Sequence, residues 1–373
     1  MSKTIINLVS AETIPNVLFI KENSDADEII FISTERMEKQ NKTEAIIAGA
    51  DVNIPYKLLI TSPDEPEKLE KDLNRLDLDY SNDILVNLTG GTKIMAIIVY
   101  QFFSRRGTRI YYQPIGKSYF ERIFPYPVEK LQIEYKLNVQ EYLRSYNVSI
   151  VSKAGRPEFS YEQCIHMFDT ISKKNKEELF ILREFRNNTR IQKLLKSKKK
   201  INIEEKYCKE AFDSLNTKNK TEENLHSICK EFCDTYPEIT KTQLNWLLGG
   251  WLEELFWYAL RKNHQLEDDY LEMNCQIVKE NVKNEIDILV VKENKLHLFE
   301  CKTGMKVKVG DIINETIYKV TSIKSKFGIN AATWLITLEE GLKEHHLARA
   351  KESRLEIVRR EELQHILNGD SIL

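Results

Sequence analysis

Short apolar runs alternate with helix-like stretches from the start of the chain to about residue 130, and this alternation limits the possible folds more than any other feature. Runs such as Ile5–Val9 and Ile84–Leu88 are strand-like, whereas Pro66–Leu76 and Lys93–Phe103 have the character of helices. Strands that alternate with helices of about ten residues are typical of βαβ units, whose parallel strands form one sheet with helices on its faces. The pattern therefore predicts a Rossmann-like α/β domain over residues 1–133.

The rest of the chain divides into two parts by the same criterion. Residues 134–240 are polar, rich in Lys and mostly helical in pattern, which predicts a helical connector. From residue 241 onward, an apolar helix at Leu244–Arg261 is followed by strand-like runs at Cys275–Lys279, Glu285–Val291 and Lys295–Cys301. Residues 241–373 are therefore expected to form a second α/β domain.

Charge and composition exclude several classes of protein. The 55 Lys and Arg residues nearly balance 57 Asp and Glu, giving a formal net charge of −2, so any nucleic-acid contact must be local. No stretch is long and apolar enough for a transmembrane helix, and the N-terminus does not read as a secretory signal. The six cysteines are scattered without a CxxC pair, which argues against zinc. We therefore expect a cytoplasmic protein with no membrane association.

Acidic and basic side chains gather at the ends of two predicted strands in the last domain. Asp287 begins the strand before the turn at 292–294, and Glu300 and Lys302 end the strand after it. The start of one hairpin strand lies beside the end of the next, so Asp287 and Glu300 should be neighbours, and Glu300 and Lys302 should share a face. Two converging carboxylates repel each other unless a divalent cation lies between them, and a nearby lysine can stabilise charge on a phosphate. The pattern indicates a metal-dependent site.

The motif Asp287…Glu300-Cys301-Lys302 resembles that of the PD-(D/E)xK nuclease superfamily. This resemblance implies a restriction-endonuclease-like α/β fold, catalysis by Asp287, Glu300 and Lys302, and a further acidic residue on the preceding helix. The segment GGWLEE offers Glu253 and Glu254 for that position, and we favour Glu253. The implied metal ligands are Asp287, Glu300 and Glu253, and the implied metal is Mn²⁺ or Mg²⁺.

A second motif, NLTGGTK at 87–93, follows the predicted strand Ile84–Leu88 and opens a helix. Glycines at such a turn let backbone amides approach a ligand, and a helix N-terminus favours an anion. The spacing is neither that of a Walker A loop nor that of a dinucleotide fingerprint. The loop at 10–16 follows the first strand and should reach the same carboxyl edge of the sheet, where open α/β sheets bind ligands. The two loops together predict a phosphate-containing ligand, although a plain helix cap would also explain the second.

Taken together, these features resemble the CARF domain, a CRISPR-associated Rossmann-like sensor of cyclic oligoadenylates. The resemblance implies ligand contacts from both loops and from the end of the second strand. The implied contact residues are Ser10, Ala11, Thr13, Thr34, Thr89, Gly90, Gly91, Thr92, Lys93 and Met95, with Ser33 and Gln113 to Gly116 as secondary candidates.

A CARF domain followed by a PD-(D/E)xK domain is similar to the accessory nucleases of type III CRISPR systems that cyclic tetra-adenylate activates. That resemblance implies a homodimer whose two CARF domains share one ligand, and an antiviral endonuclease acting on single-stranded RNA and DNA, with nicking of duplex DNA in some members. It does not determine which of these substrates is preferred.

Other interpretations remain open. A ligand-responsive transcription regulator would use a DNA-binding segment within 160–240 but has no use for the acids and lysine. Arg360 and His365 match the RxxxxH motif of HEPN ribonucleases, yet that fold is all helical. An aromatic group around Trp251 is either core or a base-stacking surface. A basic set either tracks a nucleic-acid backbone or forms a solvated helix face, and its members are Arg183, Arg186, Arg190, Lys193, Lys196 and Lys198 to Lys200.

Overall fold

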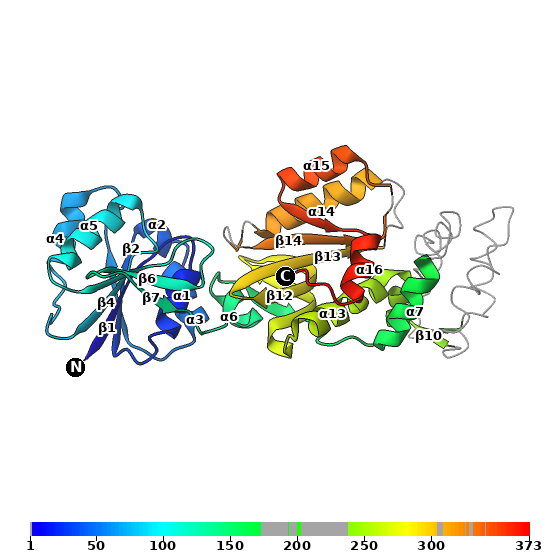
Figure 1. Cartoon of the computed structure of the whole chain (residues 1–373), viewed down its shortest axis with the longest axis horizontal. Coiled ribbons are helices and arrows are strands. Elements are labelled where there is room, and N and C mark those ends of the chain that lie inside the picture. Colours follow the sequence, from blue (N-terminus) through cyan, green and yellow to red (C-terminus); the bar gives the residue numbers. More distant parts are fainter. Residues whose placement is uncertain are drawn as a thin grey trace.

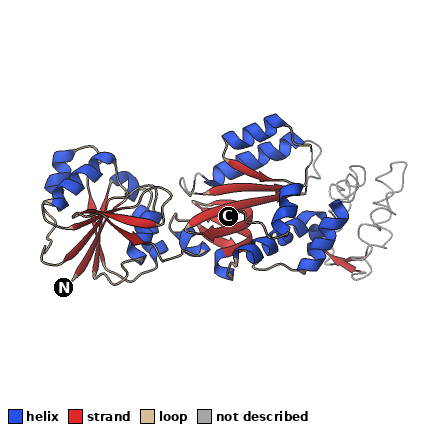
Figure 2. Cartoon of the chain, viewed as in Figure 1, coloured by secondary structure: helices blue, strands red, loops and turns tan. Residues whose placement is uncertain are grey.

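The structure is a computed structural model that describes residues 2–172, 193, 200–202, 238–303, 309–324, 326–327, 331–339 and 341–373. Two α/β domains are joined end to end, with the N-terminal sheet at one end of the molecule and the C-terminal sheet next to it (Figure 1). Both domains are layered, with helices on the faces of their sheets (Figure 2). The mixed α/β class expected from the sequence is confirmed. Most of the predicted basic set, namely Arg183, Arg186, Arg190, Lys196, Lys198 and Lys199, lies outside the described residues.

The N-terminal sheet has seven strands in the order β3-β2-β1-β4-β5-β6-β7. Its strands are β1 (Lys3–Leu8), β2 (Glu28–Ser33), β3 (Tyr56–Ile60), β4 (Asp83–Asn87), β5 (Arg109–Tyr112), β6 (Tyr119–Phe124) and β7 (Glu129–Gln132). The first five are parallel to one another, β6 pairs antiparallel with β5, and β7 pairs antiparallel with β6. Its helices are α1 (Ile14–Lys21), α2 (Glu35–Glu38), α3 (Lys42–Ala50), α4 (Pro66–Leu73) and α5 (Lys93–Ser104). The apolar runs of β1, β2 and β4 are buried because helices cover both faces of a parallel sheet.

The C-terminal sheet has six strands in the order β15-β14-β13-β12-β11-β8. Its strands are β8 (Ser149–Ser152), β11 (Leu271–Lys279), β12 (Val282–Lys292), β13 (Lys295–Lys302), β14 (Ala332–Thr337) and β15 (Leu355–Val358). The accompanying helices are α7 (Tyr161–Ser172), α12 (Lys241–Asn245), α13 (Trp251–His264), α14 (Val309–Lys324), α15 (Glu344–Glu352) and α16 (Arg360–Leu367), with short turns η1 (Trp246–Gly250) and η2 (Asp268–Tyr270). A mixed sheet of this kind rules out the all-helical HEPN alternative.

The expected boundary at residue 241 differs from the structure. Strand β8 pairs with β11 at the edge of the C-terminal sheet, and Met167 and Phe168 of α7 join the core around Leu252 of α13. Strands β9 (Lys200–Asn202) and β10 (Glu238–Thr240) also pair within the segment that we expected to be helical. The sequence of β8, SIVS, is too short and too polar to show a strand period, so its place depends on its partner β11.

The aromatic group of the sequence analysis belongs to this core. Trp246, Trp251, Phe256 and Trp257 are all at most 4% exposed. The fifth member, Tyr258, is half-buried against the same core and donates its hydroxyl to Phe159 O at 2.8 Å. The core interpretation is therefore confirmed, and these rings are not free to stack on bases. None of the helices in the described part of the chain is both long enough and apolar enough to span a bilayer.

Helix α6 (Val139–Arg144) lies between the two domains and joins their cores. Tyr142 and Tyr146 belong to one apolar cluster with Phe19 of α1 and with Leu289 of β12. Helices α3 and α6 approach so closely that a Cβ at Gly49 would lie 2.9 Å from the Cα of Ser145. The two domains therefore share packed apolar surface.

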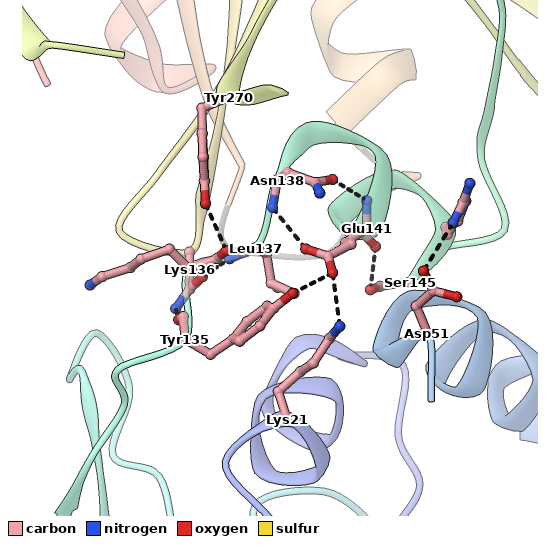
Figure 3. Close-up of polar contacts among 11 residues, drawn as sticks. Lys21, Asp51, Tyr135, Lys136, Leu137, Asn138, Glu141, Ser145 and Tyr270 are labelled. Carbon is pink, nitrogen blue, oxygen red and sulfur yellow. Dashed lines mark hydrogen bonds and ion pairs between the residues drawn. The ribbon is translucent and has the colours of Figure 1, made fainter. Parts of the chain in front are cut away.

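Polar contacts fix the same junction (Figure 3). The Glu141 carboxylate accepts hydrogen bonds from Lys21 Nζ at 2.8 Å and from the Tyr135 hydroxyl at 2.6 Å, and the Lys21 and Glu141 side chains are 9% and 8% exposed. Burial alone would lower the pKa of Lys21, but the bonds to Glu141 and Tyr135 outweigh it and raise that pKa. Glu141 also completes a capping box with Asn138 at the start of α6. This ion pair anchors α6 to α1.

The hairpin of β12 and β13 touches this junction at its tip. Glu293 and Asn294 both have positive φ, as a two-residue type I′ turn requires. Asn294 Oδ1 accepts a hydrogen bond from Leu137 N at 2.7 Å, and Asn294 Nδ2 donates to Tyr135 O at 2.9 Å. One end of the hairpin is thereby bound to the segment that leaves the N-terminal domain.

Candidate active site and ligand-binding edge

The other end of the same hairpin carries the acidic cluster. The described pairing of β12 with β13 ends at Ile288 and Phe299, and the next residues are Asp287 and Glu300. At this fork, where the backbone pairing of the two strands ends, the Asp287 side chain continues the hydrogen bonding between them, because its Oδ2 accepts a hydrogen bond from Cys301 N at 2.7 Å. Asp287, 7% exposed, and Glu300, 1% exposed, are thus held side by side away from water.

The ammonium group of Lys302 lies among three oxygens at this fork. Its Nζ is 3.1 Å from Asp287 Oδ2, 3.2 Å from Glu300 Oε2 and 3.0 Å from Cys301 O. The structure therefore brings together the three residues that the motif singled out, and adds the Cys301 carbonyl, which the motif does not predict. Oxygens that converge on a positive charge in this way are the donors that a hard divalent cation prefers.

Glu253 and Glu254, left open by the sequence, have different surroundings. The buried Glu254 carboxylate accepts hydrogen bonds from Glu158 N at 3.0 Å, Phe159 N at 3.1 Å and Trp246 Nε1 at 3.0 Å. Glu254 is thus part of the packing between α13 and the start of α7. Glu253 instead faces the acidic cluster, where burial and the nearby Asp287 charge raise its pKa to about 8.

Gly249 explains how α13 reaches this cluster. Its φ of 151° lies in a region that side-chain-bearing residues rarely adopt, and a Cβ there would lie 3.4 Å from Thr303 Oγ1. The helix N-terminus can therefore approach the end of β13 closely. Of the two glycines before Trp251, Gly249 has this role, whereas Gly250 has an ordinary helical conformation.

The electrostatics of the cluster favour a bound cation. Burial and the Asp287 charge raise the pKa of Glu300. Burial opposes the charge of Lys302, but Asp287 and Glu300 outweigh it and raise the pKa of that lysine. Within the described residues, no three His, Cys, Asp or Glu side chains are spaced to hold an ion by themselves. The donor set that fits one is therefore Asp287, Glu300 and the Cys301 carbonyl, with Glu253 next to them.

The carboxyl edge of the N-terminal sheet is the second candidate site. Connections run outward from β1 to β3 on one side and continue through β4 on the other, so a topological switch point lies between β1 and β4. A fully buried amide network fixes the two loops there: Asn87 Nδ2 donates to Asn7 Oδ1 and to Asn16 Oδ1, each at 3.0 Å. Asn7 and Asn16 were missed from the sequence, because buried asparagines carry no periodic signal.

A groove of about 1080 Å³ opens at this edge. It is lined by six of the predicted contact residues, namely Ser10, Ala11, Thr34, Gly91, Thr92 and Met95. It also brings in charged residues that the sequence did not single out: the cations Arg36, Lys39 and Lys68, from α2, the residue after it and α4, and the acids Glu35, Asp64 and Glu65. In the sequence these cations are typical of solvent-exposed helix faces. The order of the strands in the sheet is what brings their helices to the same carboxyl edge.

The remaining predicted contacts do not line this groove. Thr13 is fully buried and donates its hydroxyl to Ser145 O, so it belongs to the junction with α6. Gly90 packs against the Leu8 carbonyl, and Lys93 is exposed at the start of α5. Thr92 does line the groove, but it caps α5 by accepting from Met95 N at 3.2 Å and donates to Pro63 O at 2.9 Å, so its hydroxyl is already in use. Ser33 is buried and bonded to Glu38.

A second cavity, of about 660 Å³, lies between the two domains. Thr89 and Gln113 to Gly116 line it from the N-terminal domain, and Ser10 lines both cavities. Lys292, Asn294 and His297 of the β12–β13 hairpin line it from the C-terminal domain. The carboxyl edge of the N-terminal sheet and the hairpin therefore meet around one space.

Comparisons with known proteins identify both domains. Residues 4–142 match the family model of the Card1 CARF domain, and residues 240–369 match that of the Card1-like endonuclease domain. No curated relative matches the chain.

Three solved structures are similar in fold. Can2 from Sulfobacillus thermosulfidooxidans, in complex with cyclic tetra-adenylate, is 19% identical with a TM-score of 0.75, and the match covers 98% of each chain. Protein VC1899 from Vibrio cholerae is 16% identical with a TM-score of 0.74, covering 98% of this chain and 96% of that one. A type III CRISPR defence DNA nuclease activated by cyclic oligoadenylate is 15% identical with a TM-score of 0.51, covering 91% of this chain and 45% of that one.

Proposed function

The chain belongs to the proteins that join a Card1-type CARF domain to a Card1-like endonuclease domain, and from this premise we propose that it is a metal-dependent endonuclease of type III CRISPR antiviral defence that cyclic tetra-adenylate activates. The observation that carries the catalytic half is the position of the Lys302 ammonium among Asp287 Oδ2, Glu300 Oε2 and Cys301 O. A fold alone does not fix a function, but this cluster has the chemistry that phosphodiester hydrolysis needs.

The proposed metal is Mn²⁺ or Mg²⁺, held by Asp287, Glu300 and the Cys301 carbonyl, with Glu253 contributing from α13. When bound, such an ion would stabilise charge on a phosphate and lower the pKa of a bound water. Glu253, whose pKa lies near 8 in the metal-free chain, would give up its proton as the cation binds. Lys302 would place a positive charge beside the phosphate that is cut.

The proposed activator is cyclic tetra-adenylate, bound at the carboxyl edge of the N-terminal sheet. Backbone amides at Gly91 and the start of α5, together with Arg36, Lys39 and Lys68, offer a ring of phosphates both hydrogen bonds and positive charge. Similarity to Can2, whose structure contains this ligand, supports the choice.

We further propose a homodimer in which two such edges face one ligand, because a two-fold axis supplies every donor twice. The proposed substrates are single-stranded RNA and DNA, with nicking of duplex DNA as an additional activity. The buried free thiols of Cys164, Cys275 and Cys301 suit a reducing cytoplasm.

Helix α6 is the proposed route from ligand to nuclease. Thr13, next to the ligand loop, donates to Ser145 O, and α6 packs on β12 of the hairpin that carries Asp287 and Glu300. A ligand that moves the first loop would thereby bias the position of the hairpin.

The test is a cleavage assay on labelled single-stranded RNA and DNA with Mn²⁺, with and without cyclic tetra-adenylate. We expect cutting that depends on the ligand, and none from Glu300→Ala, which should still bind the ligand. Lys68→Glu should weaken ligand binding, whereas Lys71→Glu, an exposed reversal on the same helix that does not line the groove, should not. Wild-type cleavage by Glu300→Ala would refute the nuclease assignment. Ligand binding without any cleavage would favour the transcription-regulator alternative.

A further inference from the structure

Glu300 lies between two ammonium groups that come from different elements. Lys302 Nζ is 3.2 Å from Glu300 Oε2, and Lys319 Nζ is 2.5 Å from Glu300 Oε1. The Glu300 side chain is 2% exposed, and that of Lys319 is 32% exposed. Lys319 belongs to α14, the helix that crosses over from β13 to its parallel neighbour β14.

The two lysines act on opposite oxygens. Lys302 contacts Oε2 of Glu300 together with Asp287 Oδ2 and Cys301 O, whereas Lys319 contacts Oε1. A Glu side chain has a soft terminal torsion, and a carboxylate held at only one oxygen can rotate. Lys319 restricts that rotation, because it forms an ion pair with the other oxygen, Oε1.

We propose that Lys319 is a positioning residue, which holds Oε1 of Glu300 so that Oε2 remains turned toward Asp287 and the Cys301 carbonyl as a ligand for the divalent cation. The inference rests on the proposed nuclease function. It extends that function to a residue outside the D…ExK motif. Groups that orient metal ligands contribute to metal affinity and activity without touching the metal.

Charge alone makes the opposite prediction. Asp287, Glu300 and Glu253 supply three carboxylates to the cluster, and Lys302 and Lys319 supply two positive charges. Removing Lys319 makes the cluster more negative, and simple attraction would then strengthen cation binding. If Lys319 instead orients Glu300, its removal weakens cation binding. The sign of the change therefore separates the two roles.

The experiment is a calorimetric titration of the full-length chain with Mn²⁺ in the absence of nucleic acid. The variants are Lys319→Met, which keeps the length of the side chain without its charge, and Lys319→Arg, which restores the charge. Lys324→Met is the matched control, because it removes a lysine from the last turn of the same helix. Lys319→Met should weaken Mn²⁺ binding by roughly 10- to 100-fold, with Lys319→Arg recovering most of that loss and Lys324→Met unchanged. In the cleavage assay, Lys319→Met should lower kcat and leave KM for the nucleic acid nearly unchanged.

Three results would overturn the inference. Unchanged or tighter Mn²⁺ binding by Lys319→Met would show that Lys319 does not orient Glu300. A raised KM with normal kcat would make Lys319 a contact for substrate phosphate instead. Failure of Lys319→Arg to recover Mn²⁺ binding would indicate that Lys319 acts in packing only. If Lys319→Met folds poorly, Lys319→Gln, which keeps a hydrogen-bond donor, replaces it in the same titration. Absence of Mn²⁺ binding by the wild-type chain would refute the proposed nuclease function itself. The results above differ from it, because in them the wild-type chain still binds Mn²⁺.

Discussion

Replacing Glu253 and Glu254 one at a time by Ala should have different effects, although the two residues are adjacent. Glu254→Ala should lower the stability of the fold, and Glu253→Ala should lower the rate of cleavage. Glu254 accepts hydrogen bonds from Glu158 N, Phe159 N and Trp246 Nε1, and Glu254→Ala removes this acceptor from the buried residues Phe159 and Trp246 and from the exposed residue Glu158. A buried donor that loses its acceptor costs about 1–3 kcal/mol, so the expected loss in free energy of unfolding is at least about 2 kcal/mol.

Glu253→Ala should have the opposite profile. Asp287 and burial raise the pKa of Glu253 to about 8, so its charged form is disfavoured in the metal-free chain and its removal relieves repulsion. We expect Glu253→Ala to be at least as stable as wild type at neutral pH, because an acid whose pKa is raised on folding lowers stability above its unfolded pKa. Cleavage should fall at least about a hundredfold, since even groups that only orient metal ligands contribute 10- to 100-fold.

The assay follows from the position of the tryptophans. The chain contains four Trp residues, and all of them, Trp246, Trp251, Trp257 and Trp334, lie in the C-terminal domain. Urea unfolding followed by Trp fluorescence therefore reports on this domain alone, even if the two domains unfold separately. Cleavage by both variants is measured at a urea-free condition where each is folded. Equal stability of the two variants, or wild-type cleavage by Glu253→Ala, would show that the two carboxylates have been assigned the wrong roles.

Three further predictions follow from particular contacts. The pKa of Glu253 is raised in the folded chain, so its contribution to the free energy of unfolding should be greatest below pH 4.5 and should decrease as the pH rises toward 8. Urea unfolding at a series of pH values without metal should show this decrease for wild type and not for Glu253→Gln. Gly49→Ala would drive α3 against the Ser145 backbone, so it should cost about 1–3 kcal/mol and raise the cyclic tetra-adenylate concentration needed for half-maximal cleavage. Gly90→Ala places a Cβ 2.0 Å from Leu8 O, so ligand affinity measured by calorimetry should collapse while metal binding by the C-terminal domain persists.

The sequence predicted those parts of both sites whose residues lie on elements that are close together in the chain. Asp287, Glu300 and Lys302 were recognisable because a hairpin places the start of one strand beside the end of the next, and the structure has them within one hydrogen-bonded cluster. Strands β1, β2 and β4 were recognisable from their buried apolar runs, and their parallel arrangement followed. The antiparallel pairings of β6 and β7 were not predicted.

Contacts between distant elements were not predictable in this way. Lys319 lies on a helix with no motif of its own, and Arg36 and Lys68 reach the groove only because β2 and β3 lie beyond β1 in the sheet. Thr13 was expected to contact the ligand, but its hydroxyl is used by Ser145 O, a partner 132 positions away. Whether Glu253 or Glu254 faces the cluster depends on how α13 is rotated, and two neighbouring carboxylates carry no such information in the sequence.

The edge strand β8 and helix α7 have a consequence for how the chain is made. They precede most of the C-terminal domain in the sequence, and the bond from Phe159 N to Glu254 joins positions 95 residues apart. During synthesis, β8 and the apolar face of α7 therefore emerge long before β11 and α13 exist to cover them. A fragment restricted to residues 240–369, the span of the endonuclease family match, would have the reverse deficiency, with an unpaired β11 edge and an uncovered α13. Dissection of this nuclease into separately expressed parts should therefore cut near the start of β8, so that both segments of the domain stay in one polypeptide.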